Sequence, residues 1–174
     1  MYKYLFYIVI LSFHLLGANV SQAALPIPKP PSTGAKSFII QDHGSGNVLA
    51  EENSDVSVEP ASITKLMTAY VIFNELQSNN IALSDIVTIS EKAWRTPGSR
   101  MFVEVGKQVP VEALLQGMIV QSGNDATVAL AEYVAGSEDS FAALMNKHAE
   151  AIGLTGSHFM NSTGLPDENH YMTA

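Results

Sequence analysis

The sequence predicts an α/β (α+β) domain in which a β-hairpin comes first and apolar helices follow. Residues 37–42 and 48–50 are apolar segments on either side of a Gly-Ser-Gly turn, a pattern typical of two antiparallel strands. Later segments carry apolar residues at helical spacing, with proline or glycine at their ends. The chain has 174 residues, of which 47% are hydrophobic and 15% charged, so it can bury one core.

Residues 1–23 have the composition of a secretory signal peptide. Lys3 supplies a positive start, residues 5–16 are apolar apart from one serine and one histidine, and Ser-Gln-Ala at 21–23 offers a cleavage site. An uncleaved membrane anchor is the alternative, but a membrane span needs roughly 20 apolar residues. We therefore expect the exported chain to begin at Ala24 and to work outside the cytoplasm.

The exported chain divides into a linker and one domain. Residues 24–36 are rich in proline, which predicts an extended, semi-rigid linker without a core of its own. Residues 37–174 form the domain. In it we expect a turn at 43–47, a strand at 86–89, a loop at 95–100, and helices at 62–77, 110–120, 126–135 and 137–152. Pro110 favours a helix start, and Gly136 and Gly153 favour helix ends.

The helix at 62–77 is the element around which the candidate site is organised. Pro60 disfavours helical geometry at residue 59 and so sets the helix start. Apolar residues point in nearly every direction around the axis, so we expect this helix to be buried on all sides. Ser62 and Lys65 lie three residues apart on one face, with Cβ atoms roughly 5–6 Å apart.

A serine and a lysine in this arrangement are a candidate nucleophile and general base. Neutral lysine can accept the serine proton when burial or a nearby cation lowers its pKa. The alternative is that Ser62 caps the helix and Lys65 lies on the surface. A lysine opposes the dipole of the first helical turn and is costly on an apolar helix, which favours a functional role for Lys65.

Ser122 and Asn124 lie in a short break between two apolar helices. One interpretation is an interhelix turn in which a polar side chain caps the next helix. The other is that this corner directs both side chains into a neighbouring cleft. There Ser122 would relay a proton, and Asn124 would orient a substrate amide and Lys65.

Composition argues against several other classes of function. The net charge is −8 and the sequence has no basic cluster, so we expect no nucleic acid partner. The sequence has no cysteine, which excludes disulfides, thiolate zinc sites and a cysteine nucleophile. His43, His148, His158 and His170 lack the spacing of metal ligands, so we expect surface or loop histidines, no metal and no cofactor.

Ser-x-x-Lys at 62–65 and Ser-Gly-Asn at 122–124 resemble two of the three motifs of penicillin-binding proteins and class A β-lactamases. The chain as a whole resembles the D-alanyl-D-alanine carboxypeptidases, the low-molecular-mass penicillin-binding proteins. The similarity covers about residues 37–174, and Gly123 replaces the aspartate of the β-lactamase form. The similar segments are EPASITKLMT at 59–68, GSRMF at 98–102, QSGNDA at 121–126, NSTGL at 161–165 and HYMTA at 170–174.

The resemblance implies a β-lactamase/transpeptidase-like fold, with an antiparallel sheet and a helical subdomain. It also implies a serine peptidase in the periplasm, or at the outer face of a bacterial cytoplasmic membrane. Its partners would be the D-alanyl-D-alanine ends of peptidoglycan stem peptides, and β-lactams. Ser62 would be the nucleophile, Lys65 its base, Ser122 the proton relay and Asn124 a substrate-binding residue. The N–H of Ser62 would be one oxyanion donor.

The family's third motif, Lys-Thr-Gly, does not occur in the sequence, which stops at Ala174. We therefore expect residues 37–174 to be the N-terminal part of a larger enzyme. The remainder would hold the other sheet strands and a C-terminal region suited to peripheral membrane attachment. Residues 24–174 alone are expected to be inactive, because the absent strand would supply the second oxyanion donor and a cation near Lys65. The alternatives are a D,D-endopeptidase or β-lactamase of the same fold, or a non-catalytic envelope protein that binds muropeptides.

Overall fold

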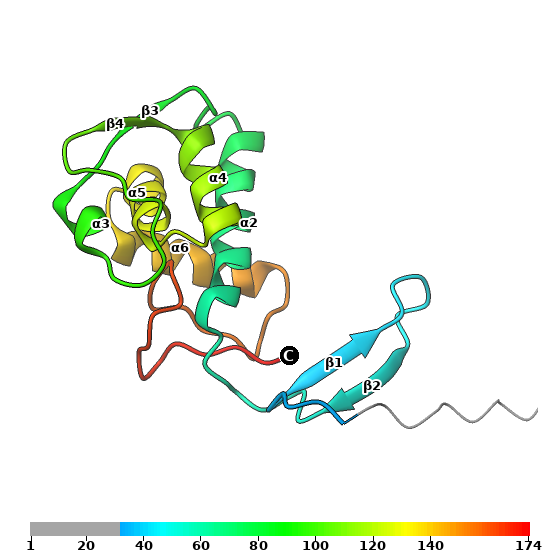
Figure 1. The fold of residues 1–174 in the computed structure, drawn as a ribbon. Helices are drawn as coiled ribbons and strands as arrows, with labels where there is room; N and C mark the ends of the chain where they lie inside the picture. Colours follow the sequence, from blue (N-terminus) through cyan, green and yellow to red (C-terminus); the bar gives the residue numbers. More distant parts are fainter. Residues whose placement is uncertain (1–31) are drawn as a thin grey trace, which may run out of the picture. The chain divides into compact units, whose positions relative to one another are not determined.

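The computed structural model describes residues 32–174, which Figure 1 draws in colour. The signal peptide expected at 1–23 and most of the linker expected at 24–36 lie outside the described residues. Residues 34–174 form one compact unit.

The first element of this unit is a β-hairpin. Strand β1 (Phe38–Gln41) pairs antiparallel with β2 (Val48–Glu52). The N–H of Asp42 closes the turn by donating to the carbonyl of Asn47 at 2.9 Å. The hairpin predicted from the two apolar segments is therefore confirmed, and β2 runs slightly beyond its predicted end.

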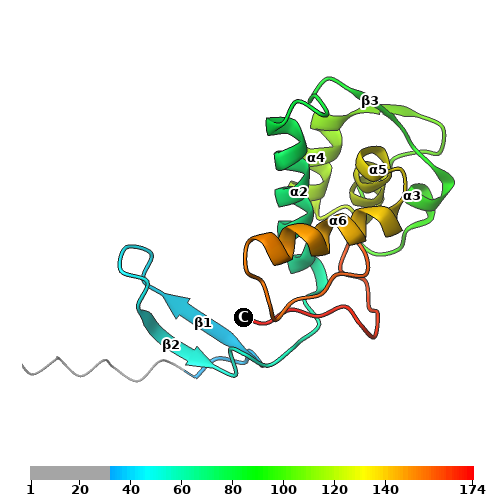
Figure 2. The same ribbon diagram turned by 180° about the vertical axis from the view of Figure 1, so that it is seen from behind.

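Helix α5 (Asn124–Ala135) is the centre of the helical core. Its side chains from Ala126 to Ala131 are buried, and most of them are small, so neighbouring helices can approach it closely. It contacts α2 (Lys65–Gln77), α3 (Glu91–Arg95), α4 (Val111–Gln121) and α6 (Glu138–Ala151). Figure 1 and the reverse view in Figure 2 show α4 beside α2. Helix α6 crosses α2 near the N-terminal end of α2.

A second, smaller sheet lies between α2 and α4 in the chain. Strand β3 (Ile86–Thr88) pairs antiparallel with β4 (Gln108–Pro110). The sequence predicted β3 but neither β4 nor the short helix α3. Three-residue strands are too short to show an alternating pattern. Helix α3 depends on its cap, because the hydroxyl of Ser90 accepts the N–H of Ala93 at 2.9 Å.

The helix predicted at 62–77 differs from the observed one in two respects. Its start is a 3-10 helix (Ala61–Thr64), and α-helical geometry begins only at Lys65. It is also not buried on all sides, because Ile63 is 60% and Leu66 71% exposed. Helices α4, α5 and α6 contact α2, and these two side chains lie away from them. Across residues 32–174, no helix combines the length and the apolar character required to cross a membrane.

Candidate active site

Ser62 is presented by a strained turn at the start of the 3-10 helix. Ala61, directly before it, has a φ of 47°, in the left-handed region that costs a residue with a side chain about 1–2 kcal/mol. Gly164 packs against the carbonyl of Ala61, and a Cβ atom on Gly164 would overlap that carbonyl. The segment 161–165 therefore packs against the backbone of this turn at Ala61, and the side chain of Ser62 is left exposed to solvent.

Lys65 lies one helical turn from Ser62, and its amine is directed at the serine hydroxyl. The Nζ atom lies 3.2 Å from Ser62 Oγ and donates to the carbonyl oxygen of Thr163 at 3.0 Å. Lys65 is 7% exposed, and burial lowers its pKa from 10.5 to about 8. About one molecule in ten would then hold a neutral amine at pH 7, against roughly one in 3,000 at a pKa of 10.5.

The position of the Thr163 carbonyl is set by a compact turn built around Asn161. Asn161 Oδ1 accepts the N–H of Gly164 at 2.8 Å and the hydroxyl of Thr163 at 3.0 Å. Asn161 Nδ2 donates to the carbonyl of Leu165 at 2.9 Å. The sequence analysis marked this segment only through a resemblance and missed its contact with Lys65. An asparagine followed three residues later by glycine was the available turn signal.

The structure also places Ser122 beside the nucleophile. Ser122 ends α4 in the left-handed conformation, with a φ of 55°. It lines a cavity of about 170 Å³ together with Ser62 and Lys65. Within residues 32–174, no hydrogen bond joins Ser122 to either of them, so its predicted relay role depends on a bound substrate or water.

Asn124, the first residue of α5, lies on the side toward which the Ser62 hydroxyl is directed. Its Nδ2 donates to the carbonyl of Pro97 at 2.6 Å, and its backbone N–H donates to the carbonyl of Ser99 at 2.7 Å. Among the described residues Lys65 donates to the carbonyl of Thr163 and makes no hydrogen bond to Asn124, so the orientation of Lys65 by Asn124 stays a prediction. The Asn124 side-chain oxygen is left to face the cavity, where it could accept a substrate N–H.

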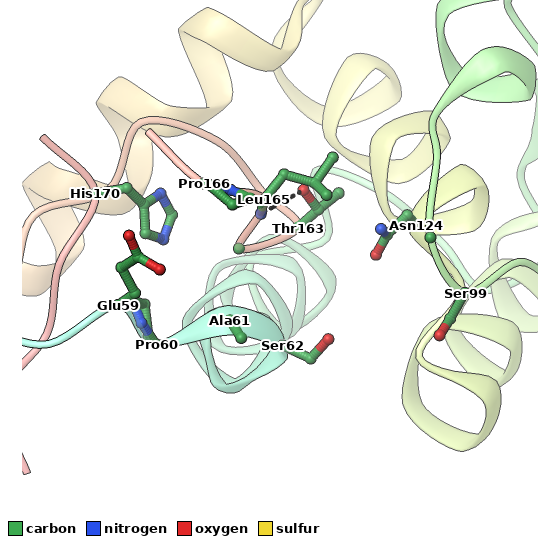
Figure 3. Close-up of a pocket in the computed structure, with 12 residues that line it drawn as sticks. Glu59, Pro60, Ala61, Ser62, Ser99, Asn124, Thr163, Leu165, Pro166 and His170 are labelled. Atoms are coloured by element: carbon green, nitrogen blue, oxygen red, sulfur yellow. Dashed lines mark hydrogen bonds between the residues drawn. The ribbon is translucent and has the colours of Figure 1, made fainter. Parts of the chain in front are cut away.

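Ser62 and Asn124 line the same larger cavity, of about 340 Å³. Figure 3 shows the Ser62 hydroxyl directed toward the side where Asn124 and Ser99 lie, with Thr163 between them and further back. Glu59 and His170 lie together at the other end. The cavity is lined by Glu59, Pro60, Ala61, Ser62, Gly98, Ser99, Asn124, Thr163, Gly164, Leu165, Pro166 and His170.

His170, which was expected at the surface or in an exposed loop, is 3% exposed. Its Nδ1 accepts the N–H of Met160 at 3.1 Å, and its Nε2 lies 2.8 Å from the hydroxyl of Thr64. An acceptor role for Nδ1 requires the neutral tautomer with its proton on Nε2. Burial lowers the pKa of His170, which agrees with a neutral ring. The histidine thus joins the segment 158–172 to the residue just before Lys65.

Asp125 is a second buried residue that the sequence analysis did not select. Its carboxylate accepts the N–H groups of Met101 at 2.8 Å and Val103 at 3.2 Å. It lies in the first turn of α5, where the helix dipole favours a negative charge. Asp125 therefore holds Met101 and Val103 against the start of α5, just after Gly98 and Ser99, which line the cavity.

Comparison with known proteins assigns the chain to a family. A family model described as D-alanyl-D-alanine carboxypeptidase matches residues 25–174. The chain is 44% identical to the carboxypeptidase DacC of Escherichia coli over 169 residues, which are 94% of this chain and 42% of DacC. It is 43% identical to DacF of Bacillus subtilis over 140 residues, which are 80% of this chain and 36% of DacF.

Solved structures agree with this assignment. The crystal structure of the carboxypeptidase DacD from Francisella tularensis matches with a TM-score of 0.80 and 42% identity, over 91% of this chain and 39% of that one. Penicillin binding protein 5 from Haemophilus influenzae matches with a TM-score of 0.80 and 42% identity, over 84% of this chain and 43% of that one. These neighbours confirm the predicted fold class. The chain spans about two fifths of the length of the relatives it matches, and it belongs to the D-alanyl-D-alanine carboxypeptidase family.

Proposed function

We propose that the complete protein is a serine-type D-Ala-D-Ala carboxypeptidase that removes the terminal D-alanine from peptidoglycan stem peptides. The observation that carries this proposal is the 3.2 Å separation of Lys65 Nζ and Ser62 Oγ, with the pKa of Lys65 lowered to about 8. A buried amine that is partly neutral near pH 7 is suited to remove the serine proton. The names of the relatives supply the substrate class.

In the acylation step, Ser62 Oγ attacks the carbonyl carbon of the D-Ala–D-Ala bond and gives its proton to Lys65 Nζ. The oxygen of the tetrahedral intermediate becomes negative, and the N–H of Ser62 is a candidate donor to it. Ser62 precedes the first hydrogen-bonded N–H of the 3-10 helix, which is that of Ile63 bound to Pro60 at 3.1 Å. Its own N–H therefore belongs to the helix-start donors that remain free for a ligand.

Collapse of the intermediate breaks the C–N bond and leaves an acyl ester on Ser62. The departing D-alanine amine needs a proton, which Lys65 holds after the first step. Ser122 shares a cavity with both Ser62 and Lys65 and is the candidate relay for that proton. Asn124, which lines the larger cavity with Ser62, would hold the substrate backbone amide. Water then attacks the ester carbonyl and gives a proton to Lys65 Nζ. The bond from the acyl carbon to Ser62 Oγ breaks, Lys65 returns the proton to Ser62 Oγ, and the shortened peptide is released.

The same chemistry would open a β-lactam ring and leave a penicilloyl ester on Ser62. One solved relative is named a penicillin binding protein. A protein that acts on peptidoglycan must be exported, and the sequence pattern of residues 1–23 supports export to the periplasm or to the outer face of the cytoplasmic membrane.

The test uses the complete gene product, with every residue that its reading frame encodes. Mass spectrometry after penicillin treatment should place the adduct on the peptide that contains Ser62, and the protein should release D-alanine from a D-alanyl-D-alanine peptide. A Ser62→Ala variant should lose both. An adduct on Ser45 or Ser122 would overturn the assignment, and rapid turnover of penicillin without D-alanine release would favour a β-lactamase.

A further inference from the structure

We infer that Glu138, in the first turn of α6, is a positioning residue for Lys65 that acts through the backbone of residues 162–163. This inference rests on the proposed function, since it concerns the base of that reaction. Glu138 does not touch the nucleophile or the cavity. Its effect would pass along a series of short, buried hydrogen bonds.

The first link joins α6 to the loop after it. Glu138 Oε1 accepts the hydroxyl of Ser162 at 2.9 Å and also lies 3.3 Å from the backbone N–H of the same residue. Ser162 is fully buried and Glu138 is nearly so. Two donors from one residue on one carboxylate oxygen fix both the side chain and the backbone of Ser162.

The second link joins that loop to α2. The carbonyl of Ser162 accepts the hydroxyl of Thr68 at 2.7 Å, and the next carbonyl, of Thr163, accepts Lys65 Nζ at 3.0 Å. Lys65 and Thr68 are three residues apart and lie on one face of α2. Two consecutive carbonyls thus accept hydrogen bonds from the helical turn that carries the base. Glu138 fixes Ser162, the residue to which the first carbonyl belongs.

The other carboxylate oxygen of Glu138 contacts a lysine and not the loop. Its Oε2 forms an ion pair with Lys92 Nζ at 2.9 Å, and the Lys92 side chain is 52% exposed. Asp139 and Glu132 also lie near enough to Lys92 to influence its charge. This pair faces solvent, whereas the Ser162 contacts face the site, so substitutions can separate the two roles.

The loop contact has a definite consequence for the base. The Thr163 carbonyl aims the Lys65 amine at Ser62, and the segment around it helps to keep water away from that amine. Without Glu138 the backbone at 162–163 is released. Lys65 should then be less buried, which raises its apparent pKa from about 8 toward 10.5, and lose its alignment, which lowers the maximal rate. A misplacement of about 1 Å can cost on the order of 10²-fold in rate.

The experiment measures the rate of penicillin acylation of the complete protein from pH 6 to pH 10. At each pH the amount of adduct is divided by the amount present when the reaction has ended, so molecules that cannot react do not affect the rate. For Glu138→Ala we expect an apparent pKa higher than that of the unmodified protein and a maximal rate reduced by about 10- to 100-fold. Glu138→Gln should largely restore the profile, because its amide oxygen still accepts from Ser162. Lys92→Met breaks the ion pair alone and should leave the profile unchanged. Ser162→Ala removes the hydroxyl link and should shift the profile in the same direction as Glu138→Ala, by less.

A purely structural role for Glu138 predicts a different result. The variant would unfold more easily, but its reactive sites would keep the original apparent pKa and maximal rate, and that outcome would overturn the inference. If Glu138→Ala does not fold, Ser162→Ala decides, and an unchanged profile in that variant would refute it. If the unmodified protein is not acylated on Ser62, the proposed function itself fails, which distinguishes that case from failure of the positioning role alone.

Discussion

Replacing Gly164 with alanine should damage both the stability of the protein and its nucleophile. Gly164 has a φ of +83°, and its missing side chain leaves room for the carbonyl of Ala61. That carbonyl belongs to the strained residue directly before Ser62. An added methyl group cannot be accommodated by a side-chain rotation, because the atom that it meets is backbone.

The chain offers a matched control at Gly153. Gly153 has a φ of +82°, and a Cβ atom there would have nothing within 4 Å. Gly153→Ala therefore carries only the backbone term, about 1–2 kcal/mol for an alanine in the left-handed region. Gly164→Ala adds an overlap of the kind that usually costs about 1–3 kcal/mol. We expect a loss of about 2–5 kcal/mol in the free energy of unfolding for Gly164→Ala.

Denaturant unfolding and the rate of penicillin acylation measure the two effects separately. Gly153→Ala should be acylated at the normal rate, whereas Gly164→Ala should be slowed because Ala61 and Ser62 must shift. A displacement of the nucleophile by about 1 Å would lower the rate on the order of 10²-fold. Equal stability losses and equal acylation rates in the two variants would show that the packing of Gly164 on Ala61 has no role in presenting Ser62.

Three further predictions concern titratable groups. Acylation of the unmodified protein should rise with pH through a midpoint of about 8, because only the neutral form of Lys65 accepts a proton. Lys65→Arg should be slower by about 10²–10⁴-fold, as arginine stays protonated, and near-normal acylation of that variant would show that charge alone is sufficient. The pKa of His170 is lowered by burial, so its contribution to stability is fully present above about pH 6.5 and is lost as pH falls through the folded-state pKa. His170→Gln can keep both hydrogen bonds without titrating, so urea unfolding at pH 7.5 and pH 5 should show a smaller acid loss than in the unmodified protein. An equal loss would mean that groups other than His170 control the acid sensitivity.

The sequence was sufficient to select a candidate nucleophile and base whose side chains the structure brings together. Ser62 and Lys65 are three residues apart, so a single helical turn brings them together whatever the rest of the chain does. The cost of a lysine in the first turn of an apolar helix then favoured a functional role. The same reasoning failed for the geometry of that turn. Helical spacing is similar in 3-10 and α-helices over four residues, and the left-handed conformation of Ala61 has no signature in an alanine.

The residues that support the site could not be predicted, because their partners are distant in sequence. Lys65 and Thr163 are separated by 98 positions, and Thr64 and His170 by 106. No periodicity connects such pairs. A histidine is normally exposed or half-buried, and only the folded structure shows that His170 is enclosed.

The apolar pattern of α2 was also read too simply. A helix that is apolar in every direction predicts burial on every side, yet Leu66 and Phe73 are exposed among the described residues. Burial is a property of the elements that surround a helix and not of the helix alone. The opposite face of α2 shows this clearly, because there α4, α5 and α6 supply the packing partners.

The same distinction applies to the chemistry of Lys65. Its distance from Ser62 follows from helical geometry, but its pKa follows from burial, which the segment 161–165 and the helices around it provide. A serine and a lysine with the same spacing on an exposed helix would lie as close together, yet the amine would keep a pKa near 10.5 and would rarely be neutral at pH 7. The motif therefore selects the candidate nucleophile and base, and the tertiary contacts set the pKa of the lysine. Substitutions at Gly164 or Glu138, which lie outside the motif, should consequently change the reactivity of Ser62 more than exposed substitutions on α2 itself.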